Sequence, residues 1–284
     1  MTTSTPTPAG SPFIHYQDNQ LFMEQVALKE LAQIYGSPLY VYSRAALQAA
    51  WQRYQEAREL GDVVVCFGMK ANSNLAILQE FARLGAGFDL VSGGELARAL
   101  KAGADPQKIV FSGVGKQVWE IEAGLHAQIK CFNVESVPEL ELISQVATRL
   151  GKTAPISLRV NPDVDAKTHP YISTGLKENK FGIDILTAPQ VYAQAKALPG
   201  IDVVGVDFHI GSQITEMSPY LDAADKLIDL LDRLREQNIE LHHVDIGGGL
   251  GIRYTDENPV HPKDLVQAVL TKLKERGYAS MQLV

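Results

Sequence analysis

Short apolar runs recur along the chain and alternate with longer amphipathic segments. Runs without an alternating polar face are typical of strands in a parallel sheet that helices cover on both sides. Seven helix-like segments separate the runs, and "PYLDAADKLIDLLDRLREQ" at 219–237 places its apolar residues on one helical face. The apolar runs lie at residues 63–67, 88–91, 109–111, 130–134, 156–160, 203–208, 243–246 and 281–284.

Eight successive strand–helix units predict a closed (β/α)8 barrel, the TIM-barrel architecture. The units extend from Val63 to Val284, a length close to the roughly 250 residues typical of that fold. A doubly wound open sheet is the structural alternative, but eight consecutive strands favour closure. In a barrel the chemistry lies at the C-terminal ends of the strands, so the residues that follow each run are the candidate site.

The residues before the first run form a separate part of the pattern. An amphipathic helix is predicted around residues 27–35 and ends at Gly36, and "PLYVY" at 38–42 is predicted to be a strand. Ser43 is a candidate N-cap for the helix that follows. The predicted organisation is a flexible, Pro- and Thr-rich tail at 1–12 without a secretion signal, an N-terminal segment at 13–43 and a barrel at 44–284.

Composition narrows the range of functions. Of the 284 residues 45% are hydrophobic, enough for one large core or two ordinary ones. The net charge of −7 comes without a basic stripe, so no nucleic-acid partner is expected. No apolar stretch approaches the roughly 18 residues of a membrane helix, and we expect a cytoplasmic protein without a membrane partner. Cys66 and Cys131 lack the spacing of metal ligands, so no metal is expected.

Lys70 stands just after the first apolar run, in "CFGMKAN". A lysine at the end of a buried strand has two interpretations. It can extend its charge into solvent, as most lysines do, or it can supply a nucleophilic amine for Schiff-base chemistry. The barrel prediction places Lys70 on the catalytic rim, where the second interpretation has a chemical use.

A glycine run and a histidine follow later strands. Gly247, Gly248 and Gly249 come after the seventh run, where barrels often bind phosphate through backbone N–H groups; a plain tight turn is the alternative. His209 follows the sixth run near Ser212, and either fills the core or faces a planar ligand. A lysine and a phosphate site on facing strands indicate a phosphorylated carbonyl compound. Pyridoxal 5′-phosphate (PLP) fits, and so does the substrate of a sugar-phosphate aldolase.

A long polar loop follows the fifth run and leads to "KENKFGI" at 177–183. Its length exceeds that of an ordinary connection in a barrel. We interpret the loop at 163–179 as a lid or substrate loop, with a plain solvated loop as the alternative.

Taken together, these motifs resemble diaminopimelate decarboxylase, a PLP-dependent enzyme with an alanine racemase- and ornithine decarboxylase-like barrel. The stretch "THPYISTGLKENKFGI" is more similar to this enzyme than to ornithine or arginine decarboxylase. The resemblance implies decarboxylation of meso-2,6-diaminopimelate to L-lysine and CO2, the last step of lysine biosynthesis, by a homodimer of the full-length protein. The matching stretches are "YVYS", "FGMKAN", "GFDLVSGGEL", "LRVNP", "THPYISTGLKENKFGI", "DFHIGSQ" and "DIGGGLG", from about residue 12 to 284.

The resemblance also implies a role for each candidate residue. Lys70 would bind PLP covalently, and His209 would stack on the pyridine ring. Ser212 and the three glycines that follow the seventh run would hold the phosphate. The supporting groups around the lysine and the ring would be Asp89, Glu95 and Arg159.

The chain departs from the family pattern at its C-terminal end. It stops at "MQLV", where the family continues with a Glu-Pro-Gly-Arg motif and a β-domain. The glutamate of that motif pairs with the pyridine nitrogen and makes the ring an effective electron sink. We therefore expect a truncated or incomplete chain with very weak or absent catalysis, whose strand at 38–42 would pair with the β-domain. A non-catalytic PLP-binding or partner-binding barrel and an ornithine or arginine decarboxylase are the alternatives.

Overall fold

The computed structural model describes residues 12–164, 181–254 and 256–284. The chain divides into two compact units, one that ends at Glu56 and one that runs from Ala57 to Val284. The border falls within the helix α2 (Arg44–Arg58). No helix of the described chain combines the length and apolar character needed to span a membrane.

The N-terminal unit begins with a small antiparallel sheet that the sequence analysis missed. Strand β1 (Ile14–Gln17) pairs with β2 (Gln20–Met23), and β2 pairs with β3 (Val26–Ala27). Asp18 and Asn19 connect the first two strands with φ values of 49° and 59°. A two-residue turn with both φ values positive suits Asp and Asn, so this dipeptide was a readable hairpin signal.

The two helices predicted in this part of the chain are confirmed. Helix α1 (Leu28–Tyr35) ends at Gly36, whose φ of 84° is accessible to glycine without strain. Helix α2 begins directly after Ser43, whose Oγ accepts a hydrogen bond from the Ala46 N–H at 2.9 Å. Ser43 is therefore an N-cap, and its hydroxyl also donates to Glu24 at 2.6 Å.

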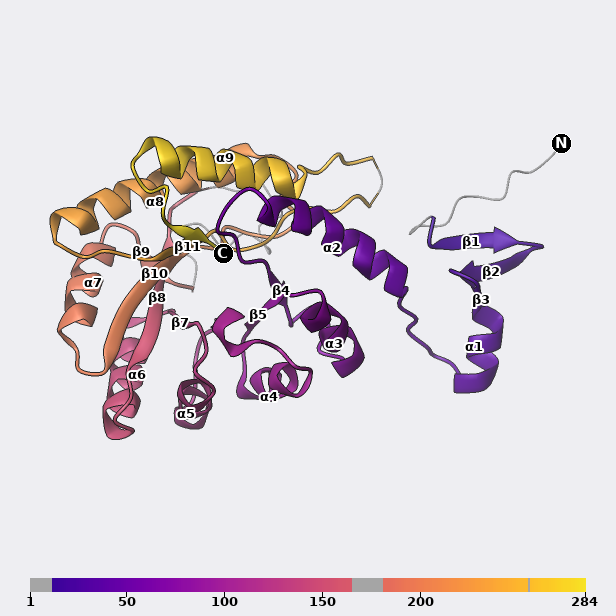
Figure 1. Ribbon diagram of the computed structural model, residues 1–284, viewed down its shortest axis with the longest axis horizontal. Coiled ribbons are helices and arrows are strands. Elements are labelled where there is room, and N and C mark those ends of the chain that lie inside the picture. The colour runs from indigo at the N-terminus through magenta and orange to yellow at the C-terminus, as the bar shows by residue number, and fades with distance from the viewer. Residues whose placement is uncertain (1–11, 165–180, 255) are drawn as a thin grey trace. The chain divides into compact units, whose positions relative to one another are not determined.

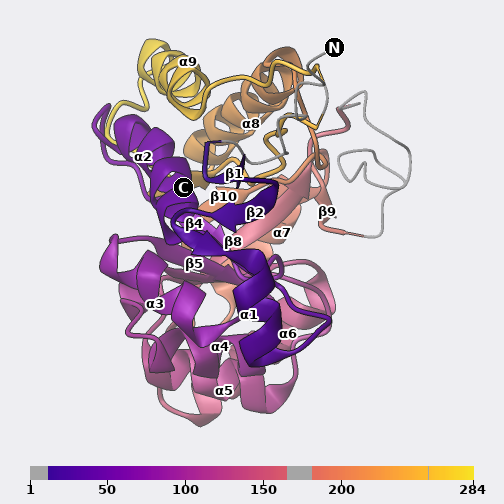
Figure 2. The same cartoon turned by 90° about the vertical axis from the view of Figure 1, so that its right-hand side faces the viewer.

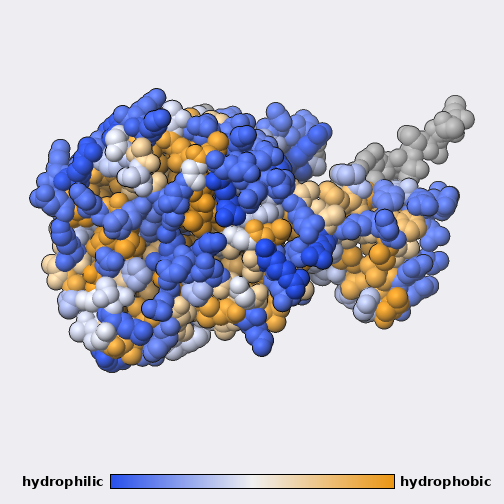
Figure 3. Space-filling view, viewed as in Figure 1, coloured by the Kyte–Doolittle hydropathy of each residue, from blue (hydrophilic) through white to orange (hydrophobic). Residues whose placement is uncertain are grey.

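The strand predicted at residues 38–42 is wrong, because these residues belong to neither a helix nor a strand. A strand is stabilised by hydrogen bonds to a neighbour, and none of the described strands pairs with this segment. Pro38 has no backbone N–H to donate to a ladder. Apolar side chains gather on the surface of this N-terminal unit, orange at the right of Figure 3, and the exposed ones include Val26, Ile34 and Leu39. The pairing of this segment with a further domain stays a prediction.

Eight parallel strands of the second unit confirm the predicted barrel. Their order is β12-β11-β10-β8-β7-β6-β5-β4, and β9 (Ile183–Asp184) pairs with the end of β8. Each predicted apolar run overlaps one of these strands. The strands are β4 (Cys66–Gly68), β5 (Gly87–Leu90), β6 (Ile109–Phe111), β7 (Cys131–Val134), β8 (Ala154–Asn161), β10 (Ile201–Asp207), β11 (His243–Asp245) and β12 (Gln282–Leu283).

The first and last strands join and close the sheet. Val63, just before β4, forms a parallel bridge with Leu283 of β12. The Val64 N–H donates to the Leu283 carbonyl at 2.8 Å, and the Leu283 N–H donates to the Asp62 carbonyl at 2.9 Å. These bonds exclude the open, doubly wound alternative, because its two edge strands would have no mutual pairing.

Helices connect successive strands and lie outside the barrel (Figure 1 and Figure 2). Two serines show why helices start where they do: Ser92 Oγ accepts from the Glu95 N–H at 3.2 Å, and Ser136 Oγ accepts from the Glu139 N–H at 3.4 Å. The helices are α3 (Leu75–Arg83), α4 (Gly93–Lys101), α5 (Val118–Ala127), α6 (Val137–Arg149), α7 (Ala188–Ala197), α8 (Ser218–Glu236) and α9 (Pro262–Glu275), with a 3₁₀ turn at Pro106–Lys108.

A histidine ring occupies the space that Gly205 leaves open in the sheet. Gly205 of β10 and His243 of β11 are neighbours in the ladder. A Cβ on Gly205 would lie 2.2 Å from His243 Nε2, far inside contact distance. His243 is only 2% exposed, so its ring has little freedom to move away. The missing side chain of Gly205 and the size of the imidazole are therefore matched.

Gly205→Ala should lower the free energy of unfolding by about 1–3 kcal/mol, the usual cost of overpacking a core. Chemical denaturation of the parent and of Gly205→Ala measures the difference in unfolding free energy. Gly68→Ala is the matched control, because a Cβ at Gly68 would meet no atom within 4 Å. Equal stability losses in the two variants would contradict the proposed clash with His243.

Candidate active site at the C-terminal rim

Lys70 lies in a turn whose preceding residue, Met69, is firmly anchored. It follows β4 and is exposed, while the preceding Met69 is only 1% exposed. The Met69 N–H donates to the carbonyl of Asp89 on the neighbouring β5 at 2.9 Å. The backbone before Lys70 is thus fixed, and its amine stays accessible at the C-terminal rim. This position suits a nucleophilic amine that must reach a ligand.

The glycine loop after β11 lies directly against the backbone that follows β10. Gly247 has a φ of 67°, and a Cβ there would lie 2.3 Å from the Phe208 carbonyl oxygen. Gly249 has a φ of 88°, and its Cβ would lie 1.9 Å from the Gly211 carbonyl oxygen. Both positions therefore require glycine. A Cβ on Gly248, by contrast, would meet nothing within 4 Å, so open space adjoins the middle of the loop.

Hydrogen bonds within the protein fix the orientation of this loop. The Gly247 N–H donates to Asp245 Oδ1 at 2.7 Å, and the Gly248 N–H donates to His209 Nδ1 at 3.3 Å. The Gly249 carbonyl accepts from the Ile214 N–H at 2.8 Å. Two of the three amides predicted to face a phosphate thus have partners inside the protein. The glycine loop is therefore held in place by the protein's own groups.

His209 is a neutral ring at the rim. Its Nδ1 accepts the Gly248 N–H, so in the neutral ring the proton is assigned to Nε2. Burial, together with the charges of Arg159 and Lys70, lowers the pKa of His209 to about 4. The imidazole therefore carries no charge at neutral pH and presents a planar surface, as stacking on a cofactor ring requires.

Ser212 lies beside the glycine loop and is exposed. A Cβ on Gly249 would come within 3.4 Å of Ser212 Cα. The structure thus brings Ser212, the glycine loop and His209 together, as the sequence predicted. The phosphate-binding role of Ser212 stays a prediction.

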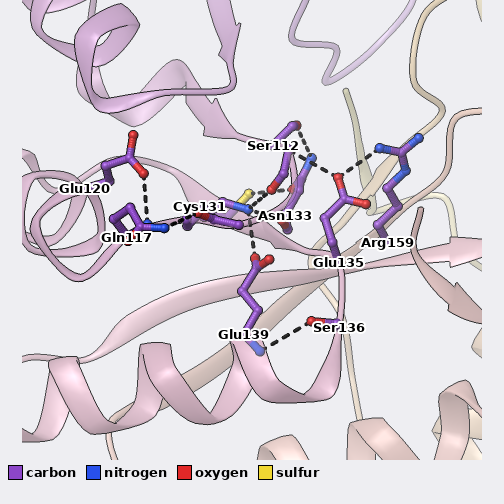
Figure 4. A network of polar contacts seen from close by, with 12 residues as sticks. Ser112, Gln117, Glu120, Cys131, Asn133, Glu135, Ser136, Glu139 and Arg159 are labelled. Atoms are coloured by element: carbon purple, nitrogen blue, oxygen red, sulfur yellow. Dashed lines mark hydrogen bonds and ion pairs between the residues drawn. The ribbon is translucent and has the colours of Figure 1, made fainter. Parts of the chain in front are cut away.

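Arg159 forms a buried ion pair that the sequence analysis did not identify. Its Nη1 lies 2.9 Å from Oε1 of Glu135, which follows β7, and the two side chains point toward each other in Figure 4. Oε1 of Glu135 also accepts the Gly113 N–H at 3.2 Å. The guanidinium carbon lies 5.0 Å from the ring centroid of Phe181. Within the described residues, Arg159 Nε and Glu135 Oε2 are buried without a hydrogen-bond partner, so both have capacity for a ligand or water.

A second buried cation holds the loop that reaches Glu135. Lys116 Nζ donates to the carbonyls of Gly113 and Asn133 and to Glu139 Oε1, each at 2.8 Å. Lys116 is 4% exposed, and these bonds tie the loop after β6 to β7 and α6. The Gly113 N–H is thereby held where it donates to Glu135. The network thus supports the ion pair, and Figure 4 shows Asn133, Glu135, Glu139 and Arg159 within it.

Three aspartates share the interior with Arg159. Asp207 is the ladder neighbour of both Arg159 and Asp245. Burial is the main cause that raises the pKa of Asp89 to about 7 and the pKa values of Asp207 and Asp245 above their usual range, and the three carboxyls also repel one another. Arg159 acts in the opposite direction on all three. The interior is thus acidic, with Arg159 as a buried counter-charge.

Glu95 forms hydrogen bonds at the start of its own helix, α4. Its Oε2 accepts the Val91 N–H at 2.7 Å, and its N–H donates to Ser92 Oγ. This is helix capping. Glu95 also raises the pKa of Asp89 through charge repulsion. Its predicted role beside Lys70 or the cofactor ring stays a prediction.

Some functional candidates carried a sequence signal that was not used. Asp207 and Asp245 are charged residues at the ends of otherwise apolar runs, which marks a rim position. Glu135 sits in a similar place. Tyr220, whose hydroxyl donates to the Gly248 carbonyl at 2.9 Å, gave no such signal, because it lies in the apolar stripe of a helix. The predicted lid at 163–179 lies, apart from its first two residues, outside the described residues.

Comparison with known proteins identifies the family. The model described as "Pyridoxal-dependent decarboxylase, pyridoxal binding domain" matches residues 44–283. The chain belongs to this family. The rim of this decarboxylase barrel offers an exposed amine, a neutral planar ring and open space beside a glycine loop, and these features fit the aldehyde, ring and phosphate of PLP. Within the described residues no cluster of three or more His, Cys, Asp or Glu side chains is arranged to hold a metal ion.

Several relatives of this chain are named diaminopimelate decarboxylase. It is 53% identical to diaminopimelate decarboxylase from Haemophilus influenzae over 96% of this chain and 65% of the relative. It is 54% identical to the one from Vibrio cholerae over 92% of this chain and 63% of the relative. The solved diaminopimelate decarboxylase from Helicobacter pylori, complexed with L-lysine, has a TM-score of 0.86 at 43% identity over 90% of this chain and 64% of that one. The chain thus spans somewhat less than two thirds of these relatives.

Removal of the buried guanidinium should destabilise the decarboxylase barrel strongly. Arg159→Met leaves Glu135 buried and unpaired, which costs roughly 3–5 kcal/mol of unfolding free energy. Arg149→Met is the matched control, since Arg149 pairs with Glu122 at the exposed surface and should cost less than about 1 kcal/mol. Denaturant titration measures both. If Arg159→Met lowered the unfolding free energy no more than Arg149→Met, the buried pair would not make the expected contribution to stability.

Asp89→Asn should change how stability depends on pH. The folded chain has an Asp89 pKa of about 7, above the roughly 3.9 of an unfolded aspartate. Between these values the folded state holds a proton that the unfolded state lacks, so Asp89 lowers stability progressively as pH rises, with its full penalty above about pH 7. The variant should therefore gain stability over the parent from pH 5 to pH 8.

Urea unfolding at several pH values measures that difference. The buried histidines contribute equally to parent and variant and cancel. The exposed Asp202→Asn on β10 is the control for loss of one negative charge, and the gain of Asp89→Asn should exceed it. A constant difference between Asp89→Asn and the parent would show that Asp89 does not titrate in this range.

Proposed function

We propose that the chain is the pyridoxal-binding barrel of a diaminopimelate decarboxylase, which converts meso-2,6-diaminopimelate to L-lysine and CO2. The observation that carries the proposal is the joint presence of Lys70, neutral His209 and the glycine loop on one rim of a chain 53% identical to such an enzyme. The L-lysine bound by the relative from Helicobacter pylori is the product of this reaction and supports the choice of substrate.

Each end of PLP has a group to hold it in this proposal. Lys70 would hold the aldehyde end, since its amine is exposed on an anchored turn. His209 would offer the ring an uncharged surface. Ser212 and the glycine loop would hold the phosphate in the open space beside Gly248. Asp89 and Arg159 would set the charge of the interior.

PLP, when bound, takes up the electron pair that remains after the Cα–carboxylate bond breaks. The chain's own residues would orient the bound cofactor and control the charge around it. Because its pKa is about 4, His209 stays uncharged and adds no positive charge at the ring face. Glu135 holds the Arg159 guanidinium in one place, where its charge opposes the rise in the pKa values of the three interior aspartates. The preorganised charges need not rearrange during the reaction.

We also propose a homodimer for the full-length protein and the cytoplasm as its compartment. Both proposals follow from the resemblance of the sequence motifs to diaminopimelate decarboxylase. Light scattering of the full-length protein tests the dimer, and a monomer at working concentration would reject it.

Lys70→Ala should abolish covalent capture of PLP. The chain is incubated with PLP, treated with borohydride to make the lysine–cofactor link permanent, and digested for mass spectrometry. We expect the adduct on Lys70 in the parent and no adduct in the variant. Lys101→Ala is the control, because Lys101 is an exposed lysine at the end of α4, and it should retain the Lys70 adduct.

The substrate is tested on the full-length protein by CO2 release from meso-2,6-diaminopimelate, L-ornithine and L-arginine. We expect release from meso-2,6-diaminopimelate and its loss in Lys70→Ala. An adduct that persists in Lys70→Ala would overturn the cofactor assignment. A preference for ornithine or arginine would overturn the substrate while leaving the cofactor in place.

A further inference from the structure

A buried tyrosine reaches the glycine loop from outside the barrel. Tyr220 lies in the first turn of α8 and is 2% exposed. Its hydroxyl donates to the carbonyl oxygen of Gly248 at 2.9 Å. Gly248 is the member of the loop beside open space, so this bond acts on the backbone at the point where an anion has room to bind.

The bond determines where a neighbouring amide points. The carbonyl of Gly248 and the N–H of Gly249 belong to one planar peptide and point in opposite directions. With the carbonyl held by Tyr220, the Gly249 N–H points away from α8. The next peptide is fixed separately, because the Gly249 carbonyl accepts the Ile214 N–H at 2.8 Å. Tyr220 thus fixes the orientation of the peptide between Gly248 and Gly249, which the other hydrogen bonds of the loop leave open.

Without the hydroxyl, the peptide between Gly248 and Gly249 has little to hold it. Glycine accepts a wide range of backbone dihedrals, so a rotation of this peptide is cheap. Such a rotation would replace the Gly249 N–H by a carbonyl oxygen on the side away from α8. A carbonyl repels an anion, whereas an N–H binds it.

We propose that Tyr220 is a positioning residue for the phosphate end of the site: it holds the Gly248 carbonyl so that the Gly249 N–H faces the phosphate of PLP. This inference rests on the proposed cofactor. Tyr220 acts through the backbone and need not touch the cofactor. Its removal should therefore weaken phosphate recognition selectively and leave the lysine and histidine end intact.

The chain offers a matched control in Tyr192 of α7. Its hydroxyl donates to the carbonyl of Gly205 at 2.9 Å, and the side chain is fully buried. Both tyrosines thus bond a glycine carbonyl from an outer helix with the same donor–acceptor distance. Gly205, however, lies within β10, where it pairs with His243 of β11 on one side and Ser157 of β8 on the other.

The test compares Tyr220→Phe and Tyr192→Phe for binding of PLP and of pyridoxal, which lacks the phosphate. Dissociation constants are measured by absorbance titration of the whole chain, and melting temperatures show that each variant is folded. We expect Tyr220→Phe to bind PLP about tenfold more weakly, the size of one hydrogen bond, with pyridoxal binding within about twofold of the parent. Tyr192→Phe should leave the ratio of the two constants unchanged.

The outcomes separate this inference from the proposed function. Equal weakening of PLP and pyridoxal by Tyr220→Phe would indicate a merely structural tyrosine and overturn the inference. So would PLP binding that Tyr220→Phe leaves unchanged, although the cofactor assignment would then survive. If the parent chain bound no PLP, the proposed cofactor and this inference would fall together.

Discussion

The candidate site depends on a direct contact between two backbones, the loop after β11 and the segment after β10. A single β-carbon on Gly249 would lie 1.9 Å from the Gly211 carbonyl oxygen, and one on Gly247 would lie 2.3 Å from the Phe208 carbonyl oxygen. No side-chain rearrangement relieves a clash with backbone. Because the loop lies this close, its amide at Gly248 reaches His209 and fixes the tautomer of that ring. The glycines therefore determine the state of the histidine as well as the shape of the loop.

Beneath this loop the barrel holds charges that a stable core alone would not need. Asp89, Asp207 and Asp245 are raised in pKa by burial, and Arg159 is committed to Glu135. A buried ion pair of this kind is weak evidence for stability, since apolar residues of the same volume often stabilise more. Interior groups that keep unpaired polar atoms are typical of a functional site. The cost of the acidic interior is thus best understood as preorganisation for a ligand.

The sequence predicted the barrel well because its strands are buried on both faces and each appears as an uninterrupted apolar run. It failed at residues 38–42, since an apolar composition does not reveal whether a pairing partner exists. The hairpin at Asp18 and Asn19 was missed although its turn residues were visible. Lys70 and His209 became candidates because each follows a predicted strand, which is a local property of the sequence. Tyr220 could not be found, because its contact with Gly248 joins residues 28 positions apart and its place in the sequence is that of a core residue.

The two ends of the site are built by different physical means, and this limits how each can vary. At the amine end, Lys70 projects from a turn held by Met69 and by one backbone bond to β5, so neighbouring side chains can change while the turn persists. At the glycine end, backbone contacts leave no room for any side chain at Gly247 or Gly249. The glycine end is therefore the rigid part of the site. Under the proposed function, selection among substrates would fall to side chains elsewhere on the rim, where volume and charge can change without moving the backbone.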